Sequence, residues 1–230
     1  MNPTIQMSAW QRLLPFFLAV PFTTIVTGLF NLAEVLPAPV ALLAGAAWGA
    51  GLGLFVTWFR ARRPGPTNAL EDGFVYLGTA AFAFAGCGGL MAILLLNGAL
   101  DSPSITGQTL GSTFLPSIPY YVVVNSLLEV LLIPGVLYLG WRPGKRRALL
   151  VTGAVMYFAM RVWTYLAFVP ARLGWAETEH TTQSLTTAER QQAASDLMLN
   201  DPRWIPILAM FALFLFAAHL PASSRCELRG

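Results

Sequence analysis

Residues 120–139 read YYVVVNSLLEVLLIPGVLYL, and residues 148–169 read ALLVTGAVMYFAMRVWTYLAFV. Each segment is long enough to cross a hydrocarbon core about 30 Å thick, because a spanning helix needs roughly 20 mostly apolar residues. The connection between them is short and contains Pro143 and Gly144, so the two helices are antiparallel neighbours. This hairpin predicts a helical membrane protein in which each of the two helices carries one charged residue within its apolar stretch.

Four other segments have the same apolar character, which predicts an all-α bundle of six transmembrane helices in a single domain, residues 1–230. The expected helices cover residues 13–33, 40–58, 74–96, 120–139, 148–169 and 204–220. The strands of a membrane β-barrel would be shorter and would alternate in hydropathy, and no such pattern occurs. The first apolar segment is longer than the core of a signal peptide, so we expect it to be a retained helix.

The composition excludes the common alternatives to a membrane protein. Of the 230 residues, 56% are hydrophobic and only 11% are charged, whereas a soluble domain averages about 25% charged residues. Disordered chains are poor in large hydrophobic residues, so this class is excluded as well. Two cysteines in unlike surroundings cannot form a disulfide framework.

Basic residues are distributed unequally between the two ends of the predicted bundle. One side holds ten of the fourteen Lys and Arg residues, namely Arg12, Arg60, Arg62, Arg63, Arg142, Lys145, Arg146, Arg147, Arg225 and Arg229. The positive-inside rule places that side, with both termini, on the cytoplasmic face of the membrane, which we expect to be a bacterial-type inner membrane. Since topology accounts for the basic excess, membrane lipids are the expected partners and nucleic acid is not.

Two connections on the opposite, outer side are long. Residues 101–119 are rich in Ser, Thr, Gly and Pro and are predicted to form a loop. Residues 170–203 are predicted to form a polar loop with a short helix from about Thr187 to Leu199. Thr186 and Glu189 have the spacing of a capping box at the start of that helix, which would either cover an outer opening or lie on the surface.

Glu129 and Arg161 are the two charged residues inside the predicted membrane segments. Glu129 lies about 13 Å from the outer end of its helix and Arg161 about 12 Å from the outer end of the next, at 1.5 Å per residue. Ionisable groups at such depth are costly and normally face a partner or a cavity. Their equal depth on adjacent helices therefore predicts an ion pair.

Other polar side chains of the bundle also fall in its outer half. These predicted ligand-binding residues, beside Glu129 and Arg161, are Asn125, Tyr157, Tyr165, Thr27, Asn31 and Glu34. They predict an outward-facing polar cavity with the charged pair at its floor. Pro134 should also disturb the helix near the pair, because it cannot donate to the Val130 carbonyl.

Three functional hypotheses are compatible with this pattern. The chain could bind or translocate a small or amphipathic ligand in the cavity. It could instead be an enzyme acting on a lipid or isoprenoid, with Glu129 as the candidate catalytic acid–base group and Arg161 holding an anion. It could also be a subunit or assembly factor that contacts a partner through Gly45, Gly49 and Gly53. Separately, the ion pair could be structural and fix the register of the helices. The sequence contains no cofactor or metal motif, so neither group is expected.

Glycines form a stripe on the second predicted helix. Gly45, Gly49 and Gly53 recur every four residues, which allows a neighbouring helix backbone to approach closely. We expect this stripe to pack on the third helix, where Ala81, Ala85 and Gly89 have the same spacing. A homodimer or a partner helix could use the same glycines.

Overall fold

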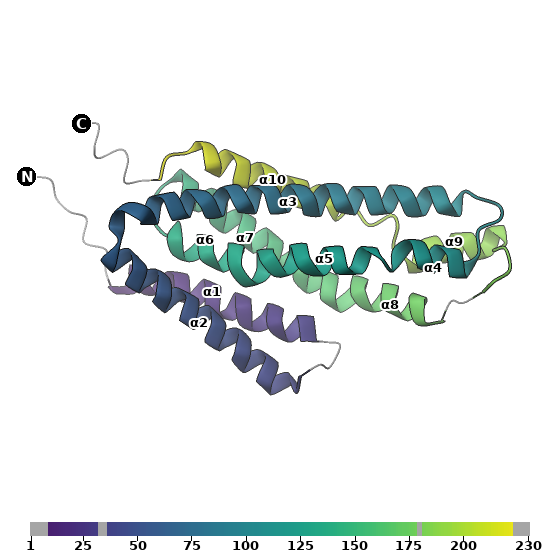
Figure 1. The fold of residues 1–230 in the computed structure, drawn as a ribbon, viewed down its shortest axis with the longest axis horizontal. Coiled ribbons are helices and arrows are strands. Elements are labelled where there is room, and N and C mark those ends of the chain that lie inside the picture. The colour runs from purple at the N-terminus through teal and green to yellow at the C-terminus, as the bar shows by residue number, and fades with distance from the viewer. Residues whose placement is uncertain (1–8, 32–35, 179–180, 223–230) are drawn as a thin grey trace, which may run out of the picture.

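The computed structural model describes residues 9–31, 36–178 and 181–222. Within these ranges the chain is all helical, with no strand beyond an isolated bridge between Thr106 and Ser184. The elements are, in chain order, α1 Ala9–Phe30, α2 Ala38–Arg62, α3 Pro64–Leu100, α4 Gly107–Phe114, α5 Ser117–Ser126, η2 Leu127–Leu132, α6 Ile133–Leu139, α7 Lys145–Trp163, η3 Thr164–Phe168, α8 Val169–Thr178, α9 Thr187–Asp196 and α10 Trp204–His219. The predicted all-α class is confirmed (Figure 1).

Five helical segments of the described chain are long and apolar enough to cross a membrane. They are Leu13–Phe30, Ala38–Arg62, Gly65–Leu100, Gly107–Leu139 and Lys145–Glu177. The sixth predicted helix, Trp204–His219, has 16 residues and is therefore roughly 24 Å long, shorter than a typical hydrocarbon core. The chain is thus a helical protein with several membrane-type segments.

Two stretches predicted as loops are partly helical. Residues 107–114 form α4, whose first turn is capped by the Thr106 hydroxyl accepting from the Thr109 amide at 3.1 Å. The helix that was expected to end near Val169 continues through Pro170 as α8. Pro170 is tolerated because it is the second residue of α8, next to a turn that is already irregular. The capping box at Thr186 and Glu189 is present and begins α9.

Both irregular turns are π-helical, and in each case a proline lies two residues after the last residue of the turn. The amide of Ile133 donates to the Leu128 carbonyl, and Pro134 follows. The amide of Val169 donates to the Thr164 carbonyl, and Pro170 follows. A proline cannot donate to the carbonyl four residues earlier, and widening the preceding turn accommodates that loss.

The glycine stripe of α2 packs on α1, not on α3 as expected. A Cβ atom at Gly45 would lie 2.9 Å from the Thr24 Cα, and one at Gly53 would lie 2.6 Å from the Phe16 ring. All three glycines are buried in this contact, so the stripe is occupied within the chain. Threonines of α1 explain the choice of partner, because their short side chains leave room for the α2 backbone.

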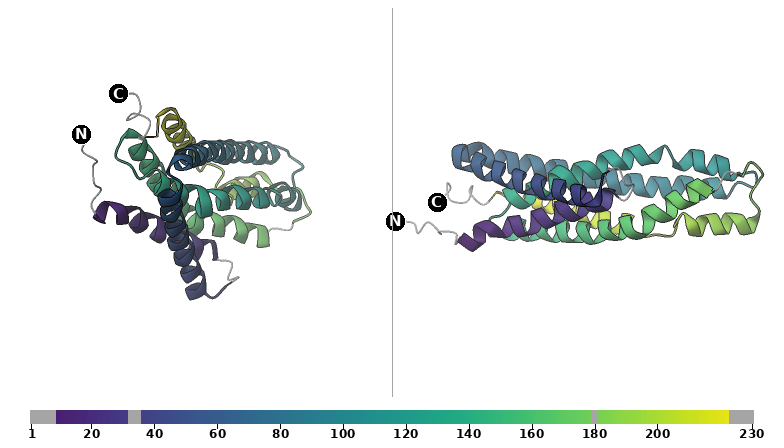
Figure 2. Two further views of the ribbon diagram at one scale, coloured as in Figure 1. Left: turned by 60° about the vertical axis from the view of Figure 1, so that its left-hand side comes forward. Right: turned by 90° about the horizontal axis from the view of Figure 1, so that it is seen from below.

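The α1–α2 hairpin leans away from the remaining helices, which lie along one long axis (Figures 1 and 2). Helix α3 has 37 residues and is roughly 55 Å long, well beyond a hydrocarbon core of about 30 Å. It runs past the hairpin to the end where α4 and α9 lie. That end, here called the cap, consists of α4, α9 and the adjoining ends of α3 and α8, and has its own apolar core around Leu100, Leu110 and Trp175.

The opposite end of the bundle, here called the basic end, is held by arginines. Arg146 is buried and forms ion pairs with Glu71 at 3.2 Å and Asp72 at 2.6 Å. Arg60 donates to the carbonyls of Tyr138 and Leu139 at the end of α6. Cations are favoured at helix C-termini, where carbonyls lack intrahelical partners. These contacts join α2, α3, α6 and α7.

Candidate functional site

The predicted ion pair between Glu129 and Arg161 is formed. Glu129 lies in the π turn η2, and Arg161 lies in the last turns of α7. The Arg161 Nε contacts the Glu129 Oε1, and the two residues are only 6% and 3% exposed. Two charges this deeply buried are stable only when they are paired, so each fixes the position of the other.

Two tyrosines complete the surroundings of the carboxylate. The Tyr157 hydroxyl donates to the Glu129 Oε1 at 3.1 Å, and the Tyr165 hydroxyl donates to the Oε2 at 2.9 Å. The Arg161 guanidinium lies over the Tyr165 ring, 4.4 Å from its centroid. The spacing of four residues places Tyr157 and Arg161 one turn apart, and the π turn η3 supplies Tyr165. We call Glu129, Tyr157, Arg161 and Tyr165 the polar cluster.

The Glu129 carboxylate is therefore occupied on both oxygens. It lies behind Tyr157, Arg161 and Tyr165, and it does not line the cavity that these three residues face. The expectation that Glu129 forms the cavity floor is corrected in this respect. The π turn η2 and the three donors from α7 and η3 hold the Glu129 carboxylate outside the cavity lining.

The cavity has a volume of about 840 Å³ and lies between α3, α5, α7, α8 and the start of α10. Its floor is formed by Asn125, Tyr157, Arg161 and Tyr165, all four of them predicted site residues. Its walls are mostly apolar and include Ala92, Ile93, Met160, Val169 and Ile207. A largely apolar cavity with a few convergent polar groups is typical of small-molecule sites.

The opposite end of the cavity, next to the cap, carries two arginines. Arg172 from α8 and Arg203 before α10 both stack on Phe168, with guanidinium carbons 4.1 and 3.1 Å from the ring centroid. Arg203 forms an ion pair with Asp201 at 2.7 Å and donates to the Thr164 hydroxyl at 3.0 Å. Burial lowers the pKa of Arg203 to about 10, so this side chain still carries its charge at neutral pH.

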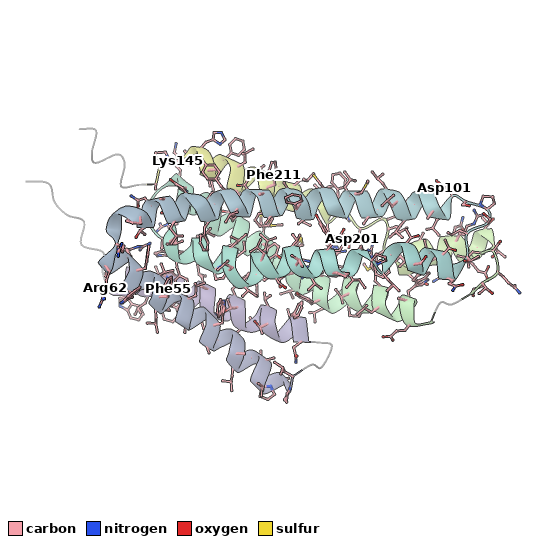
Figure 3. The ribbon with its side chains drawn as sticks, in the orientation of Figure 1. Phe55, Arg62, Asp101, Lys145, Asp201 and Phe211 are labelled. Carbon is pink, nitrogen blue, oxygen red and sulfur yellow. The ribbon has the colours of Figure 1, made fainter. Side chains whose placement is uncertain are left out.

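In Figure 3, Asp201 lies near the middle of the long axis of the molecule, whereas Lys145 and Arg62 lie at the basic end and Asp101 lies at the cap. The arginines at the cap side of the cavity are thus separate from those of the basic end. We refer to Arg172, Arg203 and Phe168 as the upper cluster.

Beside Glu129, two of the described residues that were predicted for the site, Thr27 and Asn31, do not line the cavity. Thr27 lies against Gly45 of α2. Asn31 bonds to Leu36, which lies just before α2: its side chain donates to the Leu36 carbonyl at 2.6 Å and accepts from the Leu36 amide at 2.9 Å. Glu34 lies outside the described residues. The α1 residues that do line the cavity are the apolar Leu29 and Phe30.

The upper cluster was not identified from the sequence. A helix that ends at Val169 and a polar loop over residues 170–203 place Arg172 and Arg203 outside the predicted bundle. Their sequence signal was the spacing of Phe168 and Arg172, four residues apart and therefore on one helical face. That signal has meaning only if the helix continues through Pro170.

No family model matches this chain, and no significant match was found among the curated proteins or the solved structures with which it was compared. Function is therefore inferred from the site's own residues.

Proposed function

We propose that this chain is a multi-pass membrane protein that binds a small amphipathic molecule in the cavity between the polar cluster and the upper cluster. The proposal includes six crossings of a bacterial-type inner membrane, with both termini and the basic end on its cytoplasmic side. It draws support from the positions of α1 and α10, since α1 begins and α10 ends at the basic end (Figure 1). Flanking residues and local thinning of the bilayer can accommodate a short spanning helix.

The observation that carries the proposal is the cavity itself. A volume of about 840 Å³ lies within the range of roughly 300–1,000 Å³ that is usual for small-molecule sites. Two groups of buried polar residues face it from its two ends. An ion pair that served only to fix the helices would not require an adjoining cavity of this size.

The position of Glu129 and its hydrogen bonds within the protein favour binding over catalysis. A general base must lie within hydrogen-bond reach of its substrate, and Glu129 does not line the cavity but lies behind Tyr157, Arg161 and Tyr165. The enzyme hypothesis would assign this role to another group. The described residues also contain no group of three or more His, Cys, Asp or Glu side chains that could hold a metal ion.

The test fills the cavity without altering either cluster. Gly89 lines the cavity, and a Cβ atom placed there would meet only the Trp204 Cβ, at 3.9 Å. Gly51 is an exposed helical glycine with no atom within 4 Å of its added Cβ, so Gly51→Leu is the matched control. Small molecules released from purified wild type, Gly89→Leu and Gly51→Leu would be identified by mass spectrometry.

We expect a defined compound from the wild type and from Gly51→Leu, with a much lower yield from Gly89→Leu. A compound of this kind would also identify the ligand class. The same bulk phospholipid from all three proteins, with Gly89→Leu equally well folded, would contradict the proposed function and would favour a structural role for the buried pair.

A further inference from the structure

Arg172 is a buried cation for which the protein supplies no described counter-ion. It is only 6% exposed and lines the cavity. Among the carboxylates that the structure describes, none forms an ion pair with it, whereas Arg161 pairs with Glu129 and Arg203 with Asp201. An unpaired buried charge is strongly unfavourable, so Arg172 requires an explanation.

The contacts of Arg172 orient its guanidinium but do not neutralise it. Its Nε donates to the Leu197 carbonyl at 3.0 Å, which is the C-terminal cap of α9. Its guanidinium carbon lies 4.1 Å from the centroid of Phe168 and 5.3 Å from that of Phe114. Aromatic rings attract a cation only weakly compared with a carboxylate. The side chain is thus held in one position with its charge retained.

Arg203 adds a second guanidinium on the same ring. Asp201 forms an ion pair with Arg203, and no described carboxylate pairs with Arg172. Glu177 also lines the cavity, but it is exposed and forms no ion pair with either arginine in the described chain. The upper cluster and Asp201 together carry a net charge of +1 in buried surroundings. Guanidinium groups bind phosphate and carboxylate through paired hydrogen bonds, so an anion is the complementary ligand.

The space below the upper cluster accommodates an apolar chain. Arg161 and Arg172 are eleven residues apart on the continuous helix α7–η3–α8, which corresponds to roughly 16 Å. The walls along this length are apolar, with Ile93 on α3, Met160 on α7 and Ile207 on α10. An inorganic anion alone would leave these apolar walls without a contact, so the complementary ligand also has an apolar part.

We infer that the upper cluster is the head-group subsite for an amphipathic anion, a phosphate or carboxylate attached to an apolar chain that extends toward the polar cluster. This inference rests on the proposed function and specifies its ligand class. The charged end of the ligand contacts Arg172 and Arg203, and Arg161 is already neutralised by Glu129.

The experiment measures binding of three probes to the purified full-length protein in a neutral detergent, by the change in tryptophan fluorescence, since Trp204 lines the cavity. The probes are dodecyl phosphate, dodecanol and inorganic phosphate. The variants are Arg172→Gln, Gly89→Leu and Arg190→Gln. Arg190 is the matched control because it also bonds to backbone carbonyls at the cap, those of Leu100 and Ser102, but it does not line the cavity.

For the wild type we expect dodecyl phosphate to bind at least 10-fold more tightly than dodecanol, and inorganic phosphate not to compete at millimolar concentration. Arg172→Gln should weaken dodecyl phosphate binding about 10- to 100-fold, the range for losing hydrogen bonds between charged groups, and should leave dodecanol binding unchanged. Arg190→Gln should bind both probes as the wild type does.

The outcomes separate this inference from the proposed function. Equal affinity of the wild type for dodecyl phosphate and dodecanol, with both lost in Gly89→Leu, would overturn the head-group subsite and leave the cavity as a binding site. The comparison of dodecyl phosphate with dodecanol uses the wild type and Gly89→Leu, so it remains informative even if Arg172→Gln does not fold. Competition by inorganic phosphate would identify a free anion as the ligand and would also overturn the inference. No binding of any probe, or full binding by Gly89→Leu, would contradict the proposed function itself.

Discussion

The Glu129 carboxylate is held by Tyr157, Arg161 and Tyr165, three residues of one face of a single continuous helix. This arrangement makes the charged pair a rigid unit, because each hydrogen bond restricts the rotamers of both partners. The unit positions Arg161 and the two phenol rings toward the cavity. In the proposed function, Glu129 would therefore affect ligand binding only through the residues that it orients.

At the residue scale, a double-mutant cycle measures this coupling. We expect Glu129→Gln to lower the free energy of unfolding by about 3–5 kcal/mol, because it leaves a buried guanidinium without its counter-ion. The double variant Glu129→Gln/Arg161→Gln should recover part of that loss, since it removes both charges. Chemical denaturation in detergent of the wild type, Glu129→Gln, Arg161→Gln and the double variant would give the free energies of unfolding that the cycle needs.

The control for this cycle is Asp101→Asn, which removes a negative charge from the exposed end of α3 at the cap and should change the free energy of unfolding by less than about 0.5 kcal/mol. Strictly additive losses in the double variant would mean that the two side chains do not interact.

At the scale of elements, the two π turns place the polar cluster. Pro134 cannot donate to the Val130 carbonyl, and the Trp48 indole donates to that carbonyl instead, at 2.7 Å. This contact explains why a tryptophan lies deep within the apolar part of α2. It connects α2 to the turn that carries Glu129, so the position of the carboxylate depends on a residue in another helix.

We predict that Trp48→Phe destabilises the protein by about 1–3 kcal/mol, because it leaves a backbone carbonyl unpaired in an apolar environment. Trp163→Phe is the matched control, since this side chain is also exposed at its helix surface and has no hydrogen bond among those described. Equal melting temperatures for the two variants would show that the Val130 carbonyl does not need the indole.

A second prediction at this scale concerns the α1–α2 contact. Gly45→Ala should destabilise the protein by about 1–3 kcal/mol, because the new methyl group would overlap the backbone of Thr23 and Thr24, which cannot move independently. Gly51→Ala adds the same methyl group on the open side of α2 and should be neutral or slightly stabilising. The comparison of their thermal unfolding in detergent removes the effect of helix propensity. A destabilisation of equal size in both would exclude close packing as its cause.

At the scale of the whole molecule, the long helix α3 spans the bundle from the basic end to the cap. The cap has its own core, and the cavity lies between that core and the polar cluster. If the basic end is cytoplasmic, the cap extends beyond the outer surface of the membrane. The upper cluster would then lie near the level of the outer head groups.

Cysteine labelling tests this orientation in a cysteine-free background, Cys87→Ala/Cys226→Ala. A membrane-impermeant maleimide applied to right-side-out vesicles should label Ser112→Cys on α4 and should label Gly65→Cys at the start of α3 only after permeabilisation. Both positions are exposed in the described structure. Labelling in the reverse order would invert the proposed orientation.

The number of crossings is tested by Pro221→Cys, an exposed position after α10. Six crossings predict that it is protected together with Gly65→Cys. Labelling of Pro221→Cys from outside, together with Ser112→Cys, would mean that the short helix Trp204–His219 does not cross the membrane.

The helical class, the apolar segments and the partnership of Glu129 with Arg161 are all predictable from the sequence. The first two follow from local composition, and the third follows from equal depth on two helices that a short turn forces to be neighbours. The capping box of α9 likewise depends on residues three positions apart. Such features need no knowledge of how distant segments meet.

The side chains that face the cavity are selected by contacts between segments that lie far apart in the sequence. The glycines of α2 pack on α1 because threonines there leave space, and the Val130 carbonyl is satisfied by a tryptophan 82 residues away. The continuation of the helix through Pro170 brings Arg172 next to Arg203, and their meeting on Phe168 depends on the packing of α8 against the segment before α10. Contacts between distant segments are selected by shape and by the need to pair buried polar groups, and these conditions arise only when the helices are assembled.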